Sequence, residues 1–343
     1  MTLPRITSPH ATGANRTQRV MLLVMAACVP GILTLSYFFG IGPLLNIALA
    51  CSFAVLFEAA ILALRKRPVA FFLKDCSVLV TGLLLALALP PYSPWWLIAV
   101  ASGFAVVFGK QLFGGLGQNP FNPAMLGYVV VLVSFPADMV LWPAAHSVDI
   151  ATGLQLVFSG YSIPDAWSQA TVLDALKTNN SLTLQELWQD NPAYGFFAGY
   201  SSEWVNLAFL LGGLFLLRKK LFSWHAPVGM LAALFVMSLI FWNGSGSDSN
   251  GSPLFHLLSG ATMLGAFFIV TDPVSSATSV QGRLVFGAGV GALVYIIRAW
   301  GGYPDGVAFA VLLMNLCAPT IDYFTRPRTY GHQTAKRGFK AGD

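Results

Sequence analysis

The apolar residues of this chain fall into ten runs, separated by segments rich in glycine, proline and polar residues, all of them short except 143–203. Runs of this kind predict membrane-spanning helices. Several of them, including the third, fourth, sixth and eighth, are shorter than the roughly 20 residues that a straight span needs, which indicates broken helices, tilted helices or helices extended by weakly polar flanks. The runs are 20–39, 42–64, 77–90, 95–109, 124–142, 204–217, 226–243, 254–270, 284–298 and 306–321.

Composition leads to the same class of protein. Hydrophobic residues make up 56% of the chain and charged residues only 10%, whereas a soluble domain carries about 25% charged residues. We therefore predict an all-α integral membrane protein with ten transmembrane helices. The four cysteines form no CxxC pair and lie in or at the ends of apolar runs, so we expect neither an iron–sulfur cluster nor another metal site.

Positive charges gather in the segments that fall on one side of a ten-span topology. Only Lys177 and Arg298 lie elsewhere. The positive-inside rule then places both termini in the cytoplasm, and the net charge of +5 reflects this topology and predicts no nucleic-acid partner. The charges on that side are Arg5, Arg16, Arg19, Arg65, Lys66, Arg67, Lys74, Lys110, Arg218, Lys219, Lys220, Arg283, Arg326, Arg328, Lys336, Arg337 and Lys340.

The same topology divides the chain into five segments. We predict a cytoplasmic tail, a first five-helix half, an exported (periplasmic) loop, a second five-helix half and a cytoplasmic tail at 1–19, 20–142, 143–203, 204–321 and 322–343, respectively.

The two predicted halves share a faint internal similarity. GLLLALALP at 82–90 matches GAFFIVTDP at 265–273 in its glycine, its apolar run and its final proline, and a Gly-Gly pair follows in each half. With five spans per half, the two copies would face opposite sides of the membrane and form an inverted repeat. Short spans interrupted by glycine or proline at corresponding places indicate a binding site near the membrane midplane, although both residues are frequent in membrane helices anyway.

One tetrapeptide pattern, Ser-x-Ala-Thr, occurs three times: SQAT at 168–171, SGAT at 259–262 and SSAT at 275–278. In the predicted topology the first lies in the exported loop, the second within an apolar span and the third on the cytoplasmic side. The plain interpretation of the first is a helix start, with Asp165 or Ser168 as the N-cap of a short helix through VLDALK. A helix start can also accommodate a phosphate, so a structural and a functional role are compatible.

Long blocks of the chain carry a specific resemblance, among them LKDCSVLVTGLLLALALPP, GKQLFGGLGQNPFNPAMLGYVVVL and HLLSGATMLGAFFIVTDP. Over nearly all 343 residues the chain resembles the NqrB/RnfD family, which comprises membrane proteins of the Rnf (Rsx) electron-transport complexes and of the sodium-translocating NADH:quinone reductase. The match is better to the Rnf members. The resemblance implies a urea-transporter-like fold. It also implies FMN joined through its phosphate to a threonine of a Ser-x-Ala-Thr motif, by a flavin transferase that acts outside the cytoplasm on FAD.

Carried over to this sequence, the covalent FMN site is Thr171, with Ser168 in the motif and Asp165 as the preceding acid. Thr262 is expected to lie in an apolar helix that a transferase cannot reach, where its small neighbours suit helix packing. Thr278 has an acid at the same offset, Asp272, and is rejected only because it is expected on the cytoplasmic side.

The resemblance also implies a second, non-covalent flavin, a riboflavin. A flavin ring buried in a membrane bundle needs polar partners, and the candidates are Asn119, Asn122 and Asp272 at the cytoplasmic ends of spans in opposite halves. The alternative is that the two asparagines terminate helices and that Asp272 caps the segment after it.

Three charged residues fall within or at the ends of spans. Glu58 is a functional candidate as an intramembrane acid, but it stands seven residues before Arg65 and could instead reach the lipid headgroups. Lys110 and Arg298, at the ends of their spans, are expected to extend toward the membrane surface.

The resemblance implies a flavin-carrying subunit of a multisubunit ion-translocating oxidoreductase in the cell inner membrane, not catalytic alone. That complex passes electrons between NAD(H) and ferredoxin or a similar low-potential carrier. The implied partners are the other Rnf subunits, including an exported flavoprotein, together with the flavin transferase and membrane lipid. The alternatives are a urea-type solute channel, which needs no long exported loop, and a scaffold subunit without a chromophore.

Overall fold

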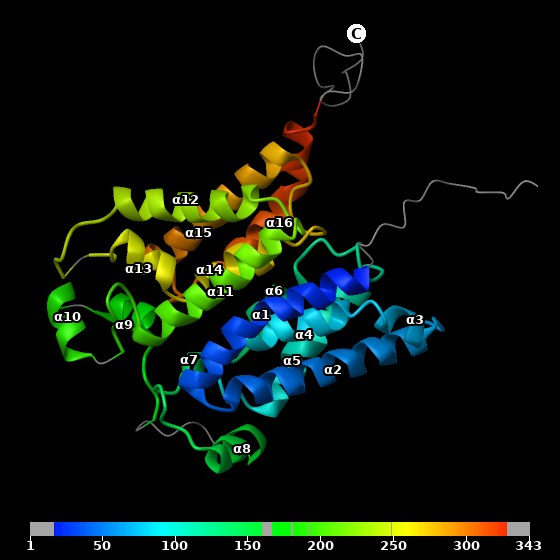
Figure 1. Ribbon diagram of the computed structural model, residues 1–343, viewed down its shortest axis with the longest axis horizontal. Coiled ribbons are helices and arrows are strands. Elements are labelled where there is room, and N and C mark those ends of the chain that lie inside the picture. Colours follow the sequence, from blue (N-terminus) through cyan, green and yellow to red (C-terminus); the bar gives the residue numbers. More distant parts are fainter. Residues whose placement is uncertain (1–16, 160–166, 180, 192, 248, 328–343) are drawn as a thin grey trace, which may run out of the picture.

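The computed structural model describes residues 17–159, 167–179, 181–191, 193–247 and 249–327, and these residues are all-helical, with two isolated β-bridges but no strand (Figure 1). The first part contains α1 (Thr17–Phe39), α2 (Gly42–Leu64), α3 (Val69–Leu73), α4 (Ser77–Ala88), α5 (Trp95–Gly103), the π-helix η1 (Phe104–Gln111) and α6 (Pro123–Ser134). A middle part contains α7 (Pro136–Val140), α8 (Ile150–Ser159), α9 (Val172–Thr178) and α10 (Leu184–Asp190). The last part contains α11 (Tyr200–Arg218), α12 (His225–Ile240), α13 (Pro253–Leu258), α14 (Thr262–Leu264), the π-helix η2 (Gly265–Ile269), α15 (Val280–Trp300) and α16 (Val307–Phe324).

All ten predicted apolar runs contain helix. Five helices, α1, α2, α11, α15 and α16, are long and apolar enough to cross a membrane. The runs that fall short of a full span differ: the sixth is extended by its flanks into α11, whereas the third ends early and the eighth is broken. Helix α4 ends because Leu89, which precedes a proline, adopts an extended ψ of 149°, a conformation that the proline ring enforces on its predecessor. The eighth run is broken into α13, α14 and η2. The all-helical prediction is therefore confirmed for the described residues, while ten complete spans stay a prediction.

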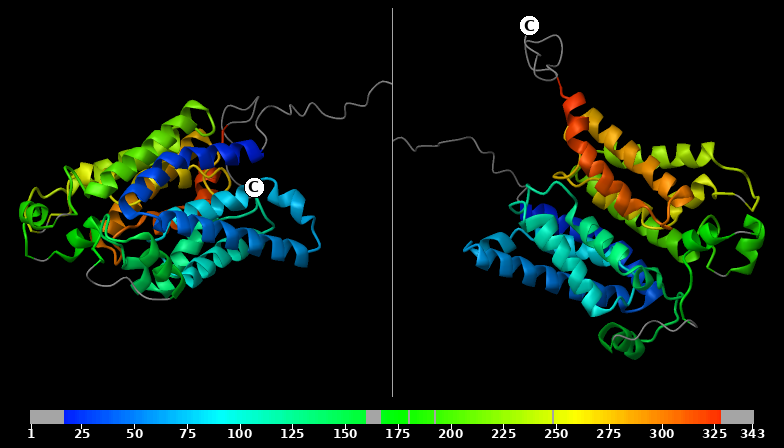
Figure 2. Two further views of the ribbon diagram at one scale, coloured as in Figure 1. Left: turned by 60° about the horizontal axis from the view of Figure 1, so that its bottom comes forward. Right: turned by 180° about the vertical axis from the view of Figure 1, so that it is seen from behind.

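The first and last parts repeat one packing pattern. Helix α2 packs against α4 and α5, and its counterpart α12 packs against α13 and α15. Helix α1 contacts α11, and α6 contacts α16, so equivalent elements meet across the boundary between the halves. Figures 1 and 2 show the two groups side by side, one coloured blue to teal and the other green to red. This pattern agrees with the internal similarity seen in the sequence.

The two ends of the molecule differ in character. The connection between α2 and α4, which contains α3 and the basic residues Arg65, Lys66, Arg67 and Lys74, lies at one end of the molecule. Helices α9 and α10 lie at the other end (Figure 1). The described part of the segment predicted as an exported loop contains three short helices, α8 to α10. Val172, Leu173, Leu187 and Tyr194 form a small core together with Phe255 of α13. The part with α9 and α10 therefore packs against the start of the eighth apolar run.

A buried carboxylate shapes the entry to α11. Glu203 is 7% exposed, and its Oε1 accepts hydrogen bonds from the backbone N–H groups of Phe197 (2.7 Å) and Ala198 (2.6 Å). The turn that precedes the helix carries Phe196, 86% exposed, at its tip. Two backbone donors thus depend on a single side chain.

We expect Glu203→Ala to destabilise this turn by about 2 kcal/mol, because it leaves two backbone donors without their acceptor. The measurement is the midpoint of thermal unfolding of the detergent-purified chain, together with chymotryptic cleavage after Phe196 or Phe197. Glu203→Gln retains one carbonyl acceptor and should have a smaller effect. Glu186→Ala, which removes an exposed capping box on α10, is the control. Equal effects of the variants at 186 and 203 would contradict this interpretation.

Candidate functional site

Thr171 lies at a cavity of about 420 Å³. It is the N-cap of α9, with extended backbone (φ −63°, ψ 154°), and its half-buried Oγ1 accepts a hydrogen bond from the N–H of Asp174 (3.3 Å). Threonine suits this position because its hydroxyl satisfies a donor of the first helical turn. This space, which we call the Thr171 cavity, is also lined by six aromatic side chains: Phe39, Tyr128, Trp142, Tyr200, Phe209 and Tyr303.

Of the other two residues predicted for the covalent flavin site, Ser168 and Asp165, the structure describes only Ser168. Ser168 forms an isolated bridge with Pro143, flanked by the bond from Ala144 N–H to the Trp167 carbonyl (2.8 Å) and that from Gln169 N–H to the Trp142 carbonyl (2.9 Å). The motif is thus held against the chain that follows α7. Asp165 lies outside the described residues.

The SGAT threonine, Thr262, is enclosed in the fold. Residues 259–261 interrupt the helix and Thr262 begins α14, so its expected position in an apolar helix is confirmed, at the start of that helix. Gly260 adopts φ +57°, which favours glycine, and a Cβ there would collide with Asp305. Thr262 is 0% exposed, and its Oγ1 donates toward the carbonyls of His256 (3.0 Å) and Ser259 (2.8 Å). A modifying enzyme has no access to this hydroxyl in the folded chain.

The third motif is accessible. Thr278 is exposed and precedes α15, where its backbone N–H donates to Asp322 Oδ1 (2.8 Å). Burial therefore distinguishes Thr171 from Thr262, whereas the choice between Thr171 and Thr278 depends on which side of the membrane each occupies.

Arg298 holds the break at SGAT together. Its guanidinium pairs with Asp305 (3.0 Å) and donates to the His256 carbonyl (2.7 Å) and to Thr262 Oγ1 (2.9 Å). Arg298 is 5% exposed, so the expectation that it extends to the membrane surface is wrong. The reason is that helix interruption frees carbonyl groups inside the fold, and a five-donor guanidinium can satisfy them. Asp305 also lines the Thr171 cavity.

Lys177, in α9, connects the motif segment to the second half. Its Nζ donates to the carbonyls of Ile297 (3.1 Å), Arg298 (3.3 Å) and Tyr303 (2.7 Å). Burial lowers the pKa of this amine, and nearby Asp174 opposes the shift. Because the C-terminal end of a helix carries a partial negative charge, a cation beside the last carbonyls of α15 is favourable, and it fixes α9 beside the Thr171 cavity.

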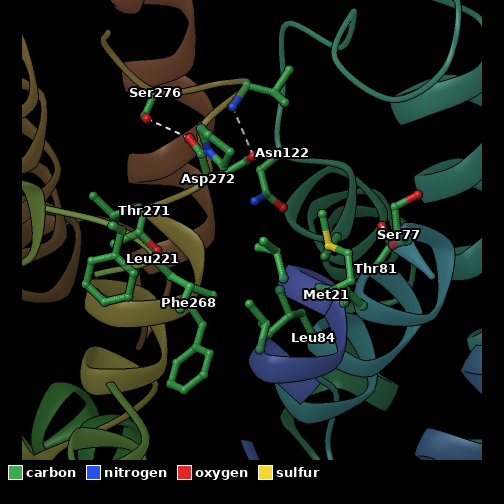
Figure 3. A pocket seen from close by; sticks show the side chains of 18 of the residues that line it. Met21, Ser77, Thr81, Leu84, Asn122, Leu221, Phe268, Thr271, Asp272 and Ser276 are labelled. Carbon is green, nitrogen blue, oxygen red and sulfur yellow. Dashed lines mark hydrogen bonds between the residues drawn. The ribbon is translucent and has the colours of Figure 1, made fainter. Parts of the chain in front are cut away.

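The structure brings Asn119, Asn122 and Asp272 to one cavity of about 220 Å³ (Figure 3). Asn122 caps α6 through Oδ1, which accepts from Met125 N–H (3.2 Å). Asn119 Nδ2 donates to the Phe121 carbonyl (2.9 Å), and Asp272 accepts from Val274 N–H (3.2 Å) and Ser275 Oγ (2.8 Å). Asp272 thus caps the segment after it, as the alternative stated, whereas Asn122 begins a helix rather than terminating one and Asn119 lies in the connection between η1 and α6. These roles coexist with convergence of the three side chains on this cavity, which we call the Asn122 cavity.

Asn315 was not foreseen as a site residue. It is 3% exposed on α16. In the amide orientation that satisfies its neighbours, its oxygen accepts from Asn122 N–H (2.9 Å) and its nitrogen donates to the Ser275 carbonyl (3.1 Å). It thus links the two walls of the Asn122 cavity. A buried asparagine in an apolar helix is the signal that could have identified it.

A buried ion pair lies at the Asn122 cavity, with Lys110 in its wall and Glu58 behind Lys110. Lys110 Nζ lies 2.8 Å from Glu58 Oε1, and both side chains are 3% exposed. Gln111 Nε2 also donates to Glu58 (2.7 Å). The expected extension of Lys110 to the membrane surface is therefore wrong, and Glu58 does not reach for headgroups, because each charge finds its counterion inside the bundle. An unpaired charge there would be far more costly.

The two cavities share their walls. On α4, Leu84 lines the Asn122 cavity and Leu87 lines the Thr171 cavity. On η2, Phe268 lines the Asn122 cavity and Ile269 lines the Thr171 cavity. Leu84 and Leu87 are separated by about 4.5 Å along the helix axis. Each cavity is therefore lined by α4 from the first half and by η2 from the second, and the two cavities follow one another along these elements.

These features define an all-helical, membrane-embedded protein of two repeated halves, with two cavities along the boundary between them. The chain belongs to the NQR2, RnfD, RnfE family, whose profile matches residues 5–331. It is 72% identical over 343 residues to a protein from Ectopseudomonas mendocina (strain ymp) described as the D component of an ion-translocating oxidoreductase complex, with all of both chains covered. The protein of the same description from Pseudomonas aeruginosa (strain UCBPP-PA14) is 70% identical over 344 residues, again covering all of both chains. That from Cellvibrio japonicus (strain Ueda107) is 56% identical, covering 98% of this chain and 97% of its own.

Proposed function

We propose that this chain is the flavin-carrying membrane subunit of an Rnf-type ion-translocating oxidoreductase complex, with FMN joined to Thr171. Membership of such a complex follows from full-length relatives described in those words. The observation that carries the flavin proposal is the position of Thr171, whose hydroxyl lies half-buried at a cavity of about 420 Å³. Ligand pockets typically measure about 300–1,000 Å³.

The residues around Thr171 fit the group. The lining combines aromatic rings, such as Tyr128 and Tyr303, with polar side chains, such as Asn206 and Asp305. A flavin ring requires both, since its faces are apolar and its pyrimidine edge is polar. In the proposed maturation a transferase moves the FMN phosphoryl group from FAD to the Thr171 hydroxyl, and AMP leaves. The bound flavin supplies the redox chemistry, and the chain fixes its position.

The Asn122 cavity is proposed to hold the second, non-covalent flavin, a riboflavin. Its support is the convergence of Asn119, Asn122 and Asp272 from opposite halves. Their amide and carboxylate groups offer donors and acceptors to a pyrimidine edge. Because the two cavities share α4 and η2 as walls, electrons would pass between two flavins through the centre of the bundle.

In this proposal the complex moves electrons between NAD(H) and ferredoxin or a similar low-potential carrier, and couples them to ion movement across the inner membrane. Both termini are cytoplasmic and 143–203 is periplasmic, where Thr171 would exchange electrons with an exported flavoprotein subunit. A urea-type channel is the alternative. Where one cavity follows the other, the lining residues Leu84, Leu87 and Phe268 are apolar. A solute channel requires polar groups along its pore for selectivity, so this apolar stretch favours the redox subunit over the channel.

The test is proteolysis and mass spectrometry of the chain co-expressed with an active flavin transferase. The peptide that contains Thr171 is expected to carry FMN, and the peptides that contain Thr262 and Thr278 are expected to be unmodified. A chain without any flavin-modified peptide would favour the channel or the scaffold.

A further inference from the structure

Lys110 faces two ways. It lines the Asn122 cavity, and its Nζ contacts both oxygens of Glu58, at 2.8 and 3.0 Å, as well as Ser77 Oγ at 2.8 Å. Glu58 lies behind it, outside the set of residues that line the cavity. The π-helical register of η1 aims two consecutive side chains, Lys110 and Gln111, at the same carboxylate.

The other charged residues of this cavity are engaged differently. Arg283 donates to Ser223 Oγ (3.1 Å) and to the Ala277 carbonyl (3.4 Å), and Asp272 accepts from Ser275 and Val274. Among the described residues that line the cavity, Lys110 is therefore the cation that pairs with a carboxylate. That carboxylate, Glu58, lies outside the cavity lining. Any new negative charge in the cavity competes with Glu58 for the same ammonium.

A bound flavin would create such a charge. Reduction by two electrons with uptake of one proton converts the neutral ring to a form with one negative charge. Opposite charges attract strongly where water is excluded. Glu58 would keep a hydrogen bond from Gln111 even when the ammonium turns toward the ring.

We propose that Lys110 tunes the reduction potential of a flavin in the Asn122 cavity and that Glu58 moderates this effect by sharing the ammonium. The inference rests on the proposed second flavin. It assigns the ion pair a role besides stability, since a buried ion pair is by itself weak support for the fold.

The test uses the full chain in lipid nanodiscs, with Thr171→Ala to remove covalent flavin, riboflavin as the probe, and absorbance recorded against applied potential. Lys110→Met should lower the equilibrium constant for two-electron reduction about tenfold, which corresponds to about 30 mV. Glu58→Gln should raise it, because the ammonium then faces only the ring. Arg283→Gln is the matched control, a cation of the same cavity without a carboxylate partner, and should shift the constant less.

Since Lys110→Met leaves Glu58 buried without its counterion, that variant risks misfolding. The double variant Glu58→Gln/Lys110→Met removes both charges and should also lie below the wild-type potential. If riboflavin binds and its reduction potential is the same in all variants, the proposed role of Lys110 is overturned, but the second flavin site is not. Absence of riboflavin binding by the unaltered cavity would overturn this inference together with the second flavin.

Discussion

Replacement of Thr171 by alanine is expected to abolish the covalent flavin. The in-gel fluorescence of the denatured chain under ultraviolet light should fall to background, because the phosphoester bond needs a hydroxyl and alanine has none. Thr262→Ala should retain the fluorescence, since Thr262 is fully buried and bonded to His256 and Ser259. Each variant is co-expressed with a transferase of verified activity.

Two further variants make this experiment decisive. Thr171→Ser keeps a hydroxyl and an N-cap acceptor and should retain some fluorescence. Thr278→Ala should retain all of it, although Thr278 is exposed. Fluorescence that survives in Thr171→Ala but is lost in Thr278→Ala would reverse both the choice of motif and the predicted orientation in the membrane.

The second large effect is expected at the Asn122 cavity. Asn122→Ser preserves an acceptor for the α6 cap but removes the amide donors, and Asp272→Ser removes the carboxylate. Asp272→Ser should weaken retention of the non-covalent flavin about tenfold or more, because a hydrogen bond that involves a charged group contributes about 1.5–3 kcal/mol and about 1.4 kcal/mol is a factor of ten. Asn122→Ser should weaken it up to about tenfold, because a neutral hydrogen bond contributes about 0.5–1.5 kcal/mol.

The measurement is the flavin released on denaturation of chains that also carry Thr171→Ala. Thr271→Val is the control, because Thr271 lines the same cavity while its hydroxyl bonds the Phe267 carbonyl (2.8 Å). Retention that is unchanged in the variants at 122 and 272 would remove these residues from the proposed flavin site. Loss in all three would indicate a general collapse of the cavity.

The sequence predicts local features well where the cause is local. The end of α4 follows from the proline after Leu89, and the interruption of the eighth run follows from its shortness and from Gly260. The convergence of Asn122 and Asp272 also agrees with the structure, because an internal repeat relates positions that are distant in the chain.

Contacts between charged residues were missed for a physical reason. A lysine or arginine at the end of an apolar run is compatible both with extension to the surface and with a buried partner. The outcome depends on which helix packs beside it. Lys110 finds Glu58 on α2, and Arg298 finds Asp305 and the carbonyls that the helix break exposes. A single sequence shows that these charged residues are present, but it does not show which of them pair in the folded chain.

The bonds of Lys177 impose an order on biosynthesis. This side chain, six residues after Thr171, is held by carbonyls that lie 120 to 126 residues further along the chain. The ribosome must therefore pass Tyr303 before α9 can take its final place. Until then, the SQAT segment is translated but lacks the walls of its cavity. The mature surroundings of Thr171 thus form only after residue 303 has been translated, and a transferase that recognises them acts on a chain that already includes Tyr303.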